Sequence, residues 1–133
     1  MSTTPINPRE LAKPVGYSHG MLAPAPGRML SIAGQIGWDG DGKLVAADFV
    51  SQFGRALANV LAVLHEAGGV PTDLITLRLY VTDKKQYLAR TKEVGAVYRE
   101  LMGSHYPSMA LVQVSDLLET GALVEIEGLA VIA

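Results

Sequence analysis

The sequence has no cysteine and no strong excess of either charge, and both absences exclude classes of function. Without cysteine, neither a disulfide bond nor a thiolate metal site can form, and a reducing compartment is expected. Eleven Lys and Arg stand against 13 Asp and Glu, which gives a net charge of −2. Nucleic-acid binders usually carry a basic stripe, and none is visible here, so nucleic acid is not an expected partner.

Long apolar runs are also missing, and a secretory leader is not expected. No apolar run approaches the roughly 20 residues of a membrane span. Residues 1–5 lack the basic start and apolar core of a signal peptide. We therefore expect a cytoplasmic protein without a membrane partner. A chain of 133 residues, 49% of them hydrophobic, is expected to form a single domain with its own core.

Proline and glycine punctuate the first third of the chain, which predicts loops around short strands. Residues 19–23 are expected to form a first strand and residues 29–33 a second, more apolar one. With a turn at 24–27 between them, the two strands are predicted to pair as a hairpin. Residues 39–42 (Asp-Gly-Asp-Gly) are interpreted as a turn rather than a calcium loop, because the further ligands of such a loop are missing.

Two helices follow from apolar residues spaced three and four apart. The first is predicted over residues 49–67, with Asp48 as its N-cap and the glycines at 68 and 69 as its stop. The second is predicted over residues 84–102 and begins after Asp83, a second natural N-cap.

Three further strands are expected over residues 74–82, 109–114 and 123–131. The order β-β-α-β-α-β-β predicts an α+β protein, a mixed sheet with two helices packed on one face. No third helix is left to cover the other face, yet the alternating residues Leu111 and Val112 make both faces apolar. An uncovered apolar sheet face predicts association with further copies of the chain.

Several short motifs are distributed along nearly the whole chain. They are Gly16-Tyr17-Ser18-His19, Ala33-Gly34-Gln35-Ile36, the helix residues Gln52, Ala56, Asn59, Val60 and Leu64 with Ala67-Gly68, Tyr80-Val81-Thr82-Asp83, Tyr106-Pro107 and Val124-Glu125-Ile126-Glu127-Gly128-Leu129-Ala130. In this order and spacing they resemble the Rid family, also called YjgF-like, over residues 7–131.

The resemblance implies a chorismate-mutase-like fold and a homotrimer with small-molecule clefts between subunits. Members of the family hydrolyse reactive enamines and imines to keto acids and ammonia, and no cofactor is implied. In them an arginine clamps the substrate carboxylate, a glutamate on the last strand handles the attacking water, and a tyrosine and a Ser-Gly pair line the cleft. A ribonuclease activity has also been attached to the family, but the acidic balance of charge argues against it here.

Carried over residue by residue, the resemblance gives Glu125 as the expected catalytic residue. Burial in a cleft would raise its affinity for a proton, which suits a general base. Ala33 replaces the serine of the Ser-Gly pair, and Met109 stands at the arginine position. The expected ligand-binding residues are Tyr17, Ala33, Gly34, Met109 and Leu111.

Met109 changes the expected chemistry. An arginine holds a carboxylate through two charge-assisted hydrogen bonds, whereas methionine has no donor. Weak binding of small 2-imino acids is expected, unless another cation replaces the arginine. Arg78 is one candidate, although we favour an exposed strand residue or a partner in an ion pair between subunits. Gly95 stands where an asparagine is frequent in the deaminases, so a second polar contact is missing.

Two functions of different classes stay open. The first is a hydrolase of enamines, imines or related small molecules, with Glu125 acting on a bound water and Glu127 as a structural or interface residue. The second is a non-catalytic, ligand-binding or stress-protective trimer, which Met109 favours. His19 and His105 have no partner at metal-ligand spacing, so no metal is implied.

Overall fold

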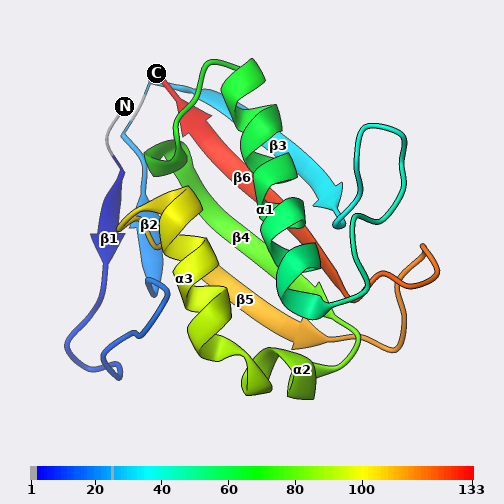
Figure 1. The fold of residues 1–133 in the computed structure, drawn as a ribbon. Helices are drawn as coiled ribbons and strands as arrows, with labels where there is room; N and C mark the ends of the chain where they lie inside the picture. The colour runs from blue at the N-terminus through cyan, green and yellow to red at the C-terminus, as the bar shows by residue number, and fades with distance from the viewer. Residues whose placement is uncertain (1–2, 25) are drawn as a thin grey trace.

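A four-stranded mixed sheet with helices on one face forms the body of the protein (Figure 1). The computed structural model describes residues 3–24 and 26–133. Residues 1–2 and Ala25, in the middle of the turn expected at 24–27, lie outside the described residues. In spatial order the sheet contains β3 (Arg28–Gln35), β6 (Val124–Ile132), β4 (Leu74–Val81) and β5 (Ser108–Gln113). The predicted α+β class is confirmed.

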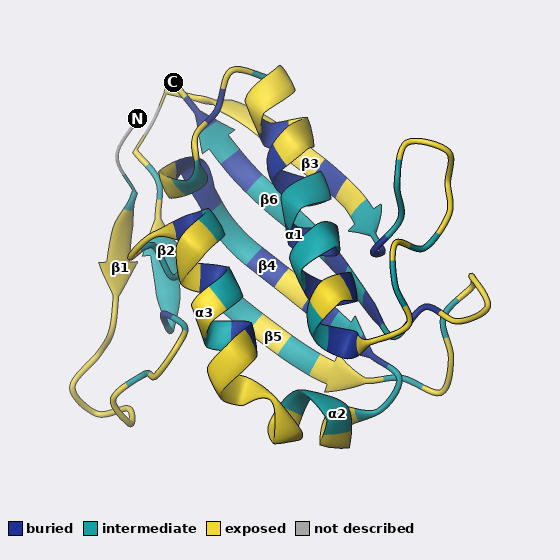
Figure 2. Cartoon of the chain, viewed as in Figure 1, coloured by how far each residue is buried: buried dark blue, intermediate teal, exposed yellow. Residues whose placement is uncertain are grey.

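The helices α1 (Phe49–Glu66), α2 (Lys84–Ala89) and α3 (Thr91–Met102) lie on the same face of this sheet (Figure 1). The alternating residues of β4 and β6 that point toward the helices form the core, with Leu77 and Ile126 fully buried against Leu57 and Leu64 of α1. Figure 2 shows this alternation as buried and less buried bands along β4 and β6. None of the described helices is both long and apolar enough to span a bilayer.

The predicted hairpin between residues 19–23 and 29–33 is wrong. β2 (Gly20–Leu22) pairs instead with β1 (Thr4–Ile6), a strand in a segment expected to be loop, and β3 pairs antiparallel with β6. β3 carries Leu30 and Ile32 on its inner face and can extend the main core by lying beside β6. Periodicity predicts that a segment is a strand, but the partner is decided by which pairing buries more apolar surface.

The second predicted helix is divided in two. Arg90 has φ −130° and ψ 25°, which is not helical, and its backbone N–H donates to the carbonyl of Tyr87 at 3.0 Å. This tight final turn closes α2, and α3 begins at the next residue, Thr91. All helices still cover one face, so the division changes the count of helices but not the layer they form.

Two polar residues of α1 hold the loops around the sheet. The buried amide of Gln52 donates to the carbonyls of Ala46 and Gly121 and accepts from the N–H of Leu123, at 2.8–3.0 Å. Asn59 donates to two carbonyls of the loop that follows β3. These two matches to the Rid motifs therefore have structural roles. Residues 39–42 form a turn as predicted, with Asp39 accepting from the N–H groups of Asp41 and Lys43.

Asp48 caps α1, and its removal is expected to destabilise the protein. Its carboxylate accepts from the N–H of Ser51 at 3.0 Å, and this hydrogen bond lowers the pKa of Asp48. Asp48→Ala should lower the free energy of unfolding by about 1 kcal/mol, measured by urea denaturation at matched protein concentration. Asp48→Asn, which keeps an acceptor, should lose much less.

The Asp48 contribution should also depend on pH. A carboxyl whose pKa is lowered in the folded state stabilises fully above its unfolded value of 3.8, and this stabilisation is lost as pH falls through the folded value. The difference between wild type and Asp48→Ala is therefore expected to shrink in acid. A difference that is constant from neutral pH to well below that value would contradict the capping role.

The face of the sheet opposite the helices has no covering element among the described residues (Figure 1). Met29 is 73% exposed near one edge and Val112 is 46% exposed on the opposite edge strand. A polar network occupies the middle strands between them. The expected uncovered face is present, and it combines apolar margins with a polar centre.

Candidate functional site

A cavity of about 510 Å³ lies between the sheet and the helices. Its lining includes apolar side chains of β4 and β5, among them Leu77, Leu79, Met109 and Leu111. Four tyrosines also line it, namely Tyr17, Tyr87, Tyr98 and Tyr106. The volume lies within the range of about 300–1,000 Å³ typical of small-molecule sites.

Tyr17 reaches this cavity because its neighbour Ser18 is tied to the start of β5. The N–H of Ser18 donates to the carbonyl of Pro107 at 3.1 Å, and its hydroxyl donates to the carbonyl of Tyr106 at 2.5 Å. Ser18 is buried by these contacts. Two motifs far apart in the sequence, residues 16–19 and 106–107, are thereby joined, which places Tyr17 and Met109 on the same cavity.

Met109 faces the helices rather than the open side of the sheet. In the parallel pair of β4 and β5 it lies opposite Leu77, and Leu111 lies opposite Leu79. Leu77 and Leu79 are core residues beneath the helices. Neighbours in register point to the same side of a sheet, so Met109 and Leu111 present apolar surface to the cavity, half-buried.

Tyr98 of α3 is fixed in one wall. Its hydroxyl donates to the carbonyl of His105 at 2.7 Å, and its ring stacks on Tyr106 with centroids 5.0 Å apart. Burial raises the pKa of Tyr98, so it stays neutral. His105 is itself held by a 2.8 Å contact between its ring Nε2 and the carbonyl of Leu74. These contacts fix the shape of this wall. The Tyr98 hydroxyl is already engaged in a hydrogen bond within the protein.

Arg99 also lines the cavity, and sequence reasoning missed it. It is the one charged residue among the described residues of the lining. Its guanidinium lies against the backbone of Gly95, where an added Cβ would stand 3.2 Å from Nη1. Helical spacing could have indicated it. Gly95 and Arg99 are four residues apart, so they are neighbours on α3, at the border of its predicted inner face.

Glu125 and Gly34 meet on the opposite, open face of the sheet. A Cβ added to Gly34 would lie 2.8 Å from Cδ of Glu125 and 3.0 Å from its Cγ. Only glycine leaves room for the carboxylate to lie across β3 at this point. Ala33 is exposed beside it, within the irregular stretch of pairing between Ile32 and Gln35. In the described part of the chain, Glu125 has no hydrogen-bond or ion-pair partner.

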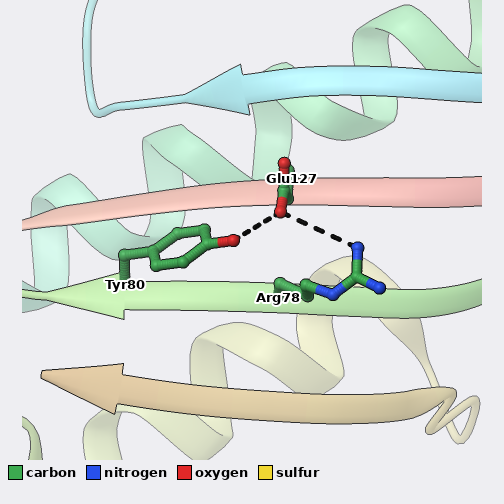
Figure 3. A network of polar contacts seen from close by, with 3 residues as sticks. All are labelled: Arg78, Tyr80 and Glu127. Atoms are coloured by element: carbon green, nitrogen blue, oxygen red, sulfur yellow. Dashed lines mark hydrogen bonds and ion pairs between the residues drawn. The ribbon is translucent and has the colours of Figure 1, made fainter.

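Glu127, two residues further along the same face, is engaged (Figure 3). It accepts a hydrogen bond from the hydroxyl of Tyr80 at 2.5 Å and lies 3.8 Å from the guanidinium of Arg78. The hydrogen bond to Glu127 raises the pKa of Tyr80. Arg78 thus belongs to an ion pair within its own chain, and it lies on the opposite side of the sheet from Met109. It cannot supply a cation beside Met109 of the same chain.

A single chain therefore divides the expected site residues into two groups. Tyr17, Met109 and Leu111 gather at the cavity, whereas Gly34 and Glu125 meet on the open face and Ala33 lies beside Gly34 in the irregular stretch of β3. Within one chain the two groups do not converge. No cluster of His, Asp and Glu able to hold a metal ion is found within the described residues.

Comparison with known proteins identifies the family. Residues 8–132 match the family model described as Endoribonuclease L-PSP. The chain is 32% identical to a RutC family protein of Pyrococcus abyssi, over 89% of this chain and 88% of that one. It is 33% identical to the 2-iminobutanoate/2-iminopropanoate deaminase of Capra hircus, over 86% and 79% respectively.

A solved structure of a Rid family protein of unknown function from Yersinia pestis superimposes with a TM-score of 0.87. The match has 32% identity and covers 99% of this chain and all of that one. These matches confirm the family that the motifs indicated and the chorismate-mutase-like fold expected from it. The chain belongs to the Rid family, and one of its relatives in that family is named a 2-iminobutanoate/2-iminopropanoate deaminase.

Proposed function

We propose that this protein hydrolyses enamines, imines or related reactive small molecules, with Glu125 positioning the attacking water in a cleft between two subunits. The observation that carries the proposal is the contrast between two carboxylates on one strand face. Glu127 is engaged by Tyr80 and Arg78, whereas Glu125 rests on Gly34 without a partner among the described residues. A carboxylate without a competing partner is suited to accept a proton from water.

The complete site requires a second copy of the chain. The cavity and Glu125 are on opposite faces of one sheet, so Glu125 of one subunit would act on a ligand in the cavity of its neighbour. The uncovered sheet face supports this arrangement, because packing it against another copy would bury Met29 and Val112 and bring Glu125 to an interface.

The reaction follows from these positions. Glu125 accepts a proton from water as the water oxygen attacks the carbon of the protonated imine, which forms a neutral tetrahedral amino alcohol. Glu125 returns this proton to nitrogen, so that ammonia becomes the leaving group. The C–N bond then breaks as the carbonyl forms and the hydroxyl proton passes to Glu125. The overall change is imine plus water to carbonyl compound plus ammonia. The name of the goat relative, a 2-imino acid deaminase, supports this reaction class.

Met109 determines which substrates we expect the protein to prefer. Its half-buried side chain and Leu111 make the sheet wall of the cavity apolar. A carboxylate placed against this wall would lose water without gaining a donor, which costs several kcal/mol when the charge stays unpaired. We therefore expect poor turnover of 2-iminopropionate and better turnover of substrates whose reacting end carries no carboxylate.

Ammonia release from freshly generated imines and enamines, charged and uncharged, tests the proposed function. A rate above the spontaneous hydrolysis of at least one compound, saturable in substrate and proportional to protein, is the expected result. If every compound decays at its spontaneous rate while ligands still bind, the protein is a binding trimer and the hydrolase proposal is wrong.

A trimer is the expected assembly. Sedimentation equilibrium at micromolar concentration should give about three times the 14.1 kDa chain mass. The physical reason is the open sheet face, whose apolar margins stay in water in the isolated chain. Placing a charge there, as in Val112→Lys, should weaken the assembly. The same change at Val63, exposed on α1 away from that face, is the control. A monomer mass for wild type would rule out the shared site.

A further inference from the structure

We infer that Arg99 is a ligand-binding residue, and that the cavity takes a small organic carboxylate whose apolar body packs on the sheet wall. This deepens the proposed function and rests on it for the use of the cavity as a substrate site. The inference begins with charge. Of the described residues that line the cavity, Arg99 alone is charged, and it has no ion pair or hydrogen-bond partner among the described residues.

The position of Arg99 is built by its neighbour on the helix. The guanidinium lies on the bare backbone of Gly95, with Nη1 3.2 Å from the place a Cβ would take. Any larger residue at Gly95 would compete for this space. Arg99 is exposed, and its guanidinium lies back along the helix over Gly95, which lines the cavity as well. The cation thus stands on the helix wall, whereas Met109 stands on the sheet wall.

The chemistry of the lining identifies the ligand class. A guanidinium is planar and suited to bind a carboxylate through two parallel hydrogen bonds. One arginine balances one negative charge, and no second cation from the described residues lines the cavity, which favours a monoanion over a phosphate ester. The rest of the lining is largely apolar and favours a ligand with an aromatic or branched aliphatic group. This part of the lining includes Leu77, Leu79, Leu111 and the ring of Tyr106.

Size also separates this ligand from the smallest imino acids. A cavity of about 510 Å³ is much larger than a three-carbon acid requires. A molecule with a single methyl group gains little from the apolar wall, because the hydrophobic contribution scales with the area buried. A phenyl or isobutyl group covers far more of that wall while its carboxylate reaches Arg99.

Equilibrium binding to the assembled protein tests the inference without requiring catalysis. The probes are 3-phenylpropionate, its uncharged amide 3-phenylpropionamide, and acetate, measured by isothermal titration calorimetry. Wild type should bind the acid more tightly than the amide, and acetate hardly at all. Arg99→Gln should weaken binding of the acid roughly tenfold or more, the usual loss for a charge-assisted hydrogen bond, and leave the amide unchanged.

Lys92→Gln is the matched control, since it removes one positive charge from an exposed position of the same helix outside the cavity lining. It should bind all probes as wild type does. Arg99 lies in the last turn of α3 and also stabilises the helix dipole there. Arg99→Lys keeps that charge, and should recover part of the affinity, because it loses only the planar pair of donors.

The inference is overturned if the acid does not bind, if acid and amide bind equally, or if Lys92→Gln weakens the acid as much as Arg99→Gln. These outcomes are separate from those of the ammonia assay. Hydrolysis that is unaffected by Arg99→Gln would leave the proposed function standing without this site. Binding through Arg99 with no ammonia release from any compound would leave the site standing without the hydrolase.

Discussion

Glu125→Gln is expected to abolish hydrolysis while leaving the assembly and its ligand affinity intact. Glutamine has the same size and can occupy the space over Gly34, but its amide cannot accept the proton of the attacking water. General-base catalysis is worth roughly 10²–10⁴-fold in rate, so kcat for the best substrate in the ammonia assay should fall by that amount. Sedimentation should give the same mass as wild type.

Two further variants make this result specific to Glu125. Glu127→Gln changes the neighbouring carboxylate on the same strand face and keeps an acceptor for Tyr80, so hydrolysis should survive. Gly34→Ala leaves the carboxylate in the protein but pushes it from its place, since the new Cβ would approach Cδ of Glu125 to 2.8 Å. Its activity should fall between wild type and Glu125→Gln. Full activity of Glu125→Gln would remove Glu125 from the mechanism.

The sequence predicted individual elements of this fold better than their partners. The strand over 74–82 and the helix over 49–67 were correct to within one residue, because long periodic segments report directly which face is buried. The partner of β3 could not be predicted in this way. Its alternation of Leu30 and Ile32 suits any apolar neighbour, and the choice of β6 depends on the packing of α1 over both strands.

The division of the candidate site into two faces was also beyond the sequence. Alternation within β6 correctly placed Glu125 and Glu127 on one side. It could not relate that side to the side of Met109, because β5 and β6 do not pair and their relation is set by β4, which lies between them. The register of β4 with each of these strands determines which side of the sheet each residue faces. Met109 faces the helices and Glu125 faces the open side.

Arg99 shows a different limit of sequence reasoning. The inner face of the second helix was predicted from its apolar and aromatic residues, among them Val94 and Tyr98, and both are buried. An arginine at the border of such a face is ordinarily a solvated residue, and Arg99 is indeed exposed, although it also lines the cavity. What gives Arg99 its place is the missing side chain at Gly95, a small residue that carries no signal unless the helix is seen against the cavity.

Met109→Arg is expected to create activity toward 2-iminopropionate that wild type has only weakly. The new guanidinium would enter the cavity from the sheet wall, where the resemblance to other Rid proteins places the carboxylate clamp. Recovering about 3 kcal/mol of transition-state binding corresponds to a rise in kcat/KM of roughly two orders of magnitude. The measurement is ammonia release with 2-iminopropionate, and the gain should vanish in Met109→Arg/Glu125→Gln, which lacks the base.

Matched substitutions separate the effect of geometry from that of charge. Met109→Lys adds the same charge without the planar pair of donors, so its gain should be smaller, and Met109→Gln, polar but uncharged, should show almost none. An arginine without ligand in this apolar cavity is also expected to lower the melting temperature, and a bound carboxylate should restore it. Suppose instead that wild type already deaminates 2-iminopropionate as fast as the goat relative does. The interpretation of Met109 is then wrong, and Arg99→Gln becomes the deciding variant, because Arg99 is the one cation of the described lining that could replace the missing arginine within the same cavity.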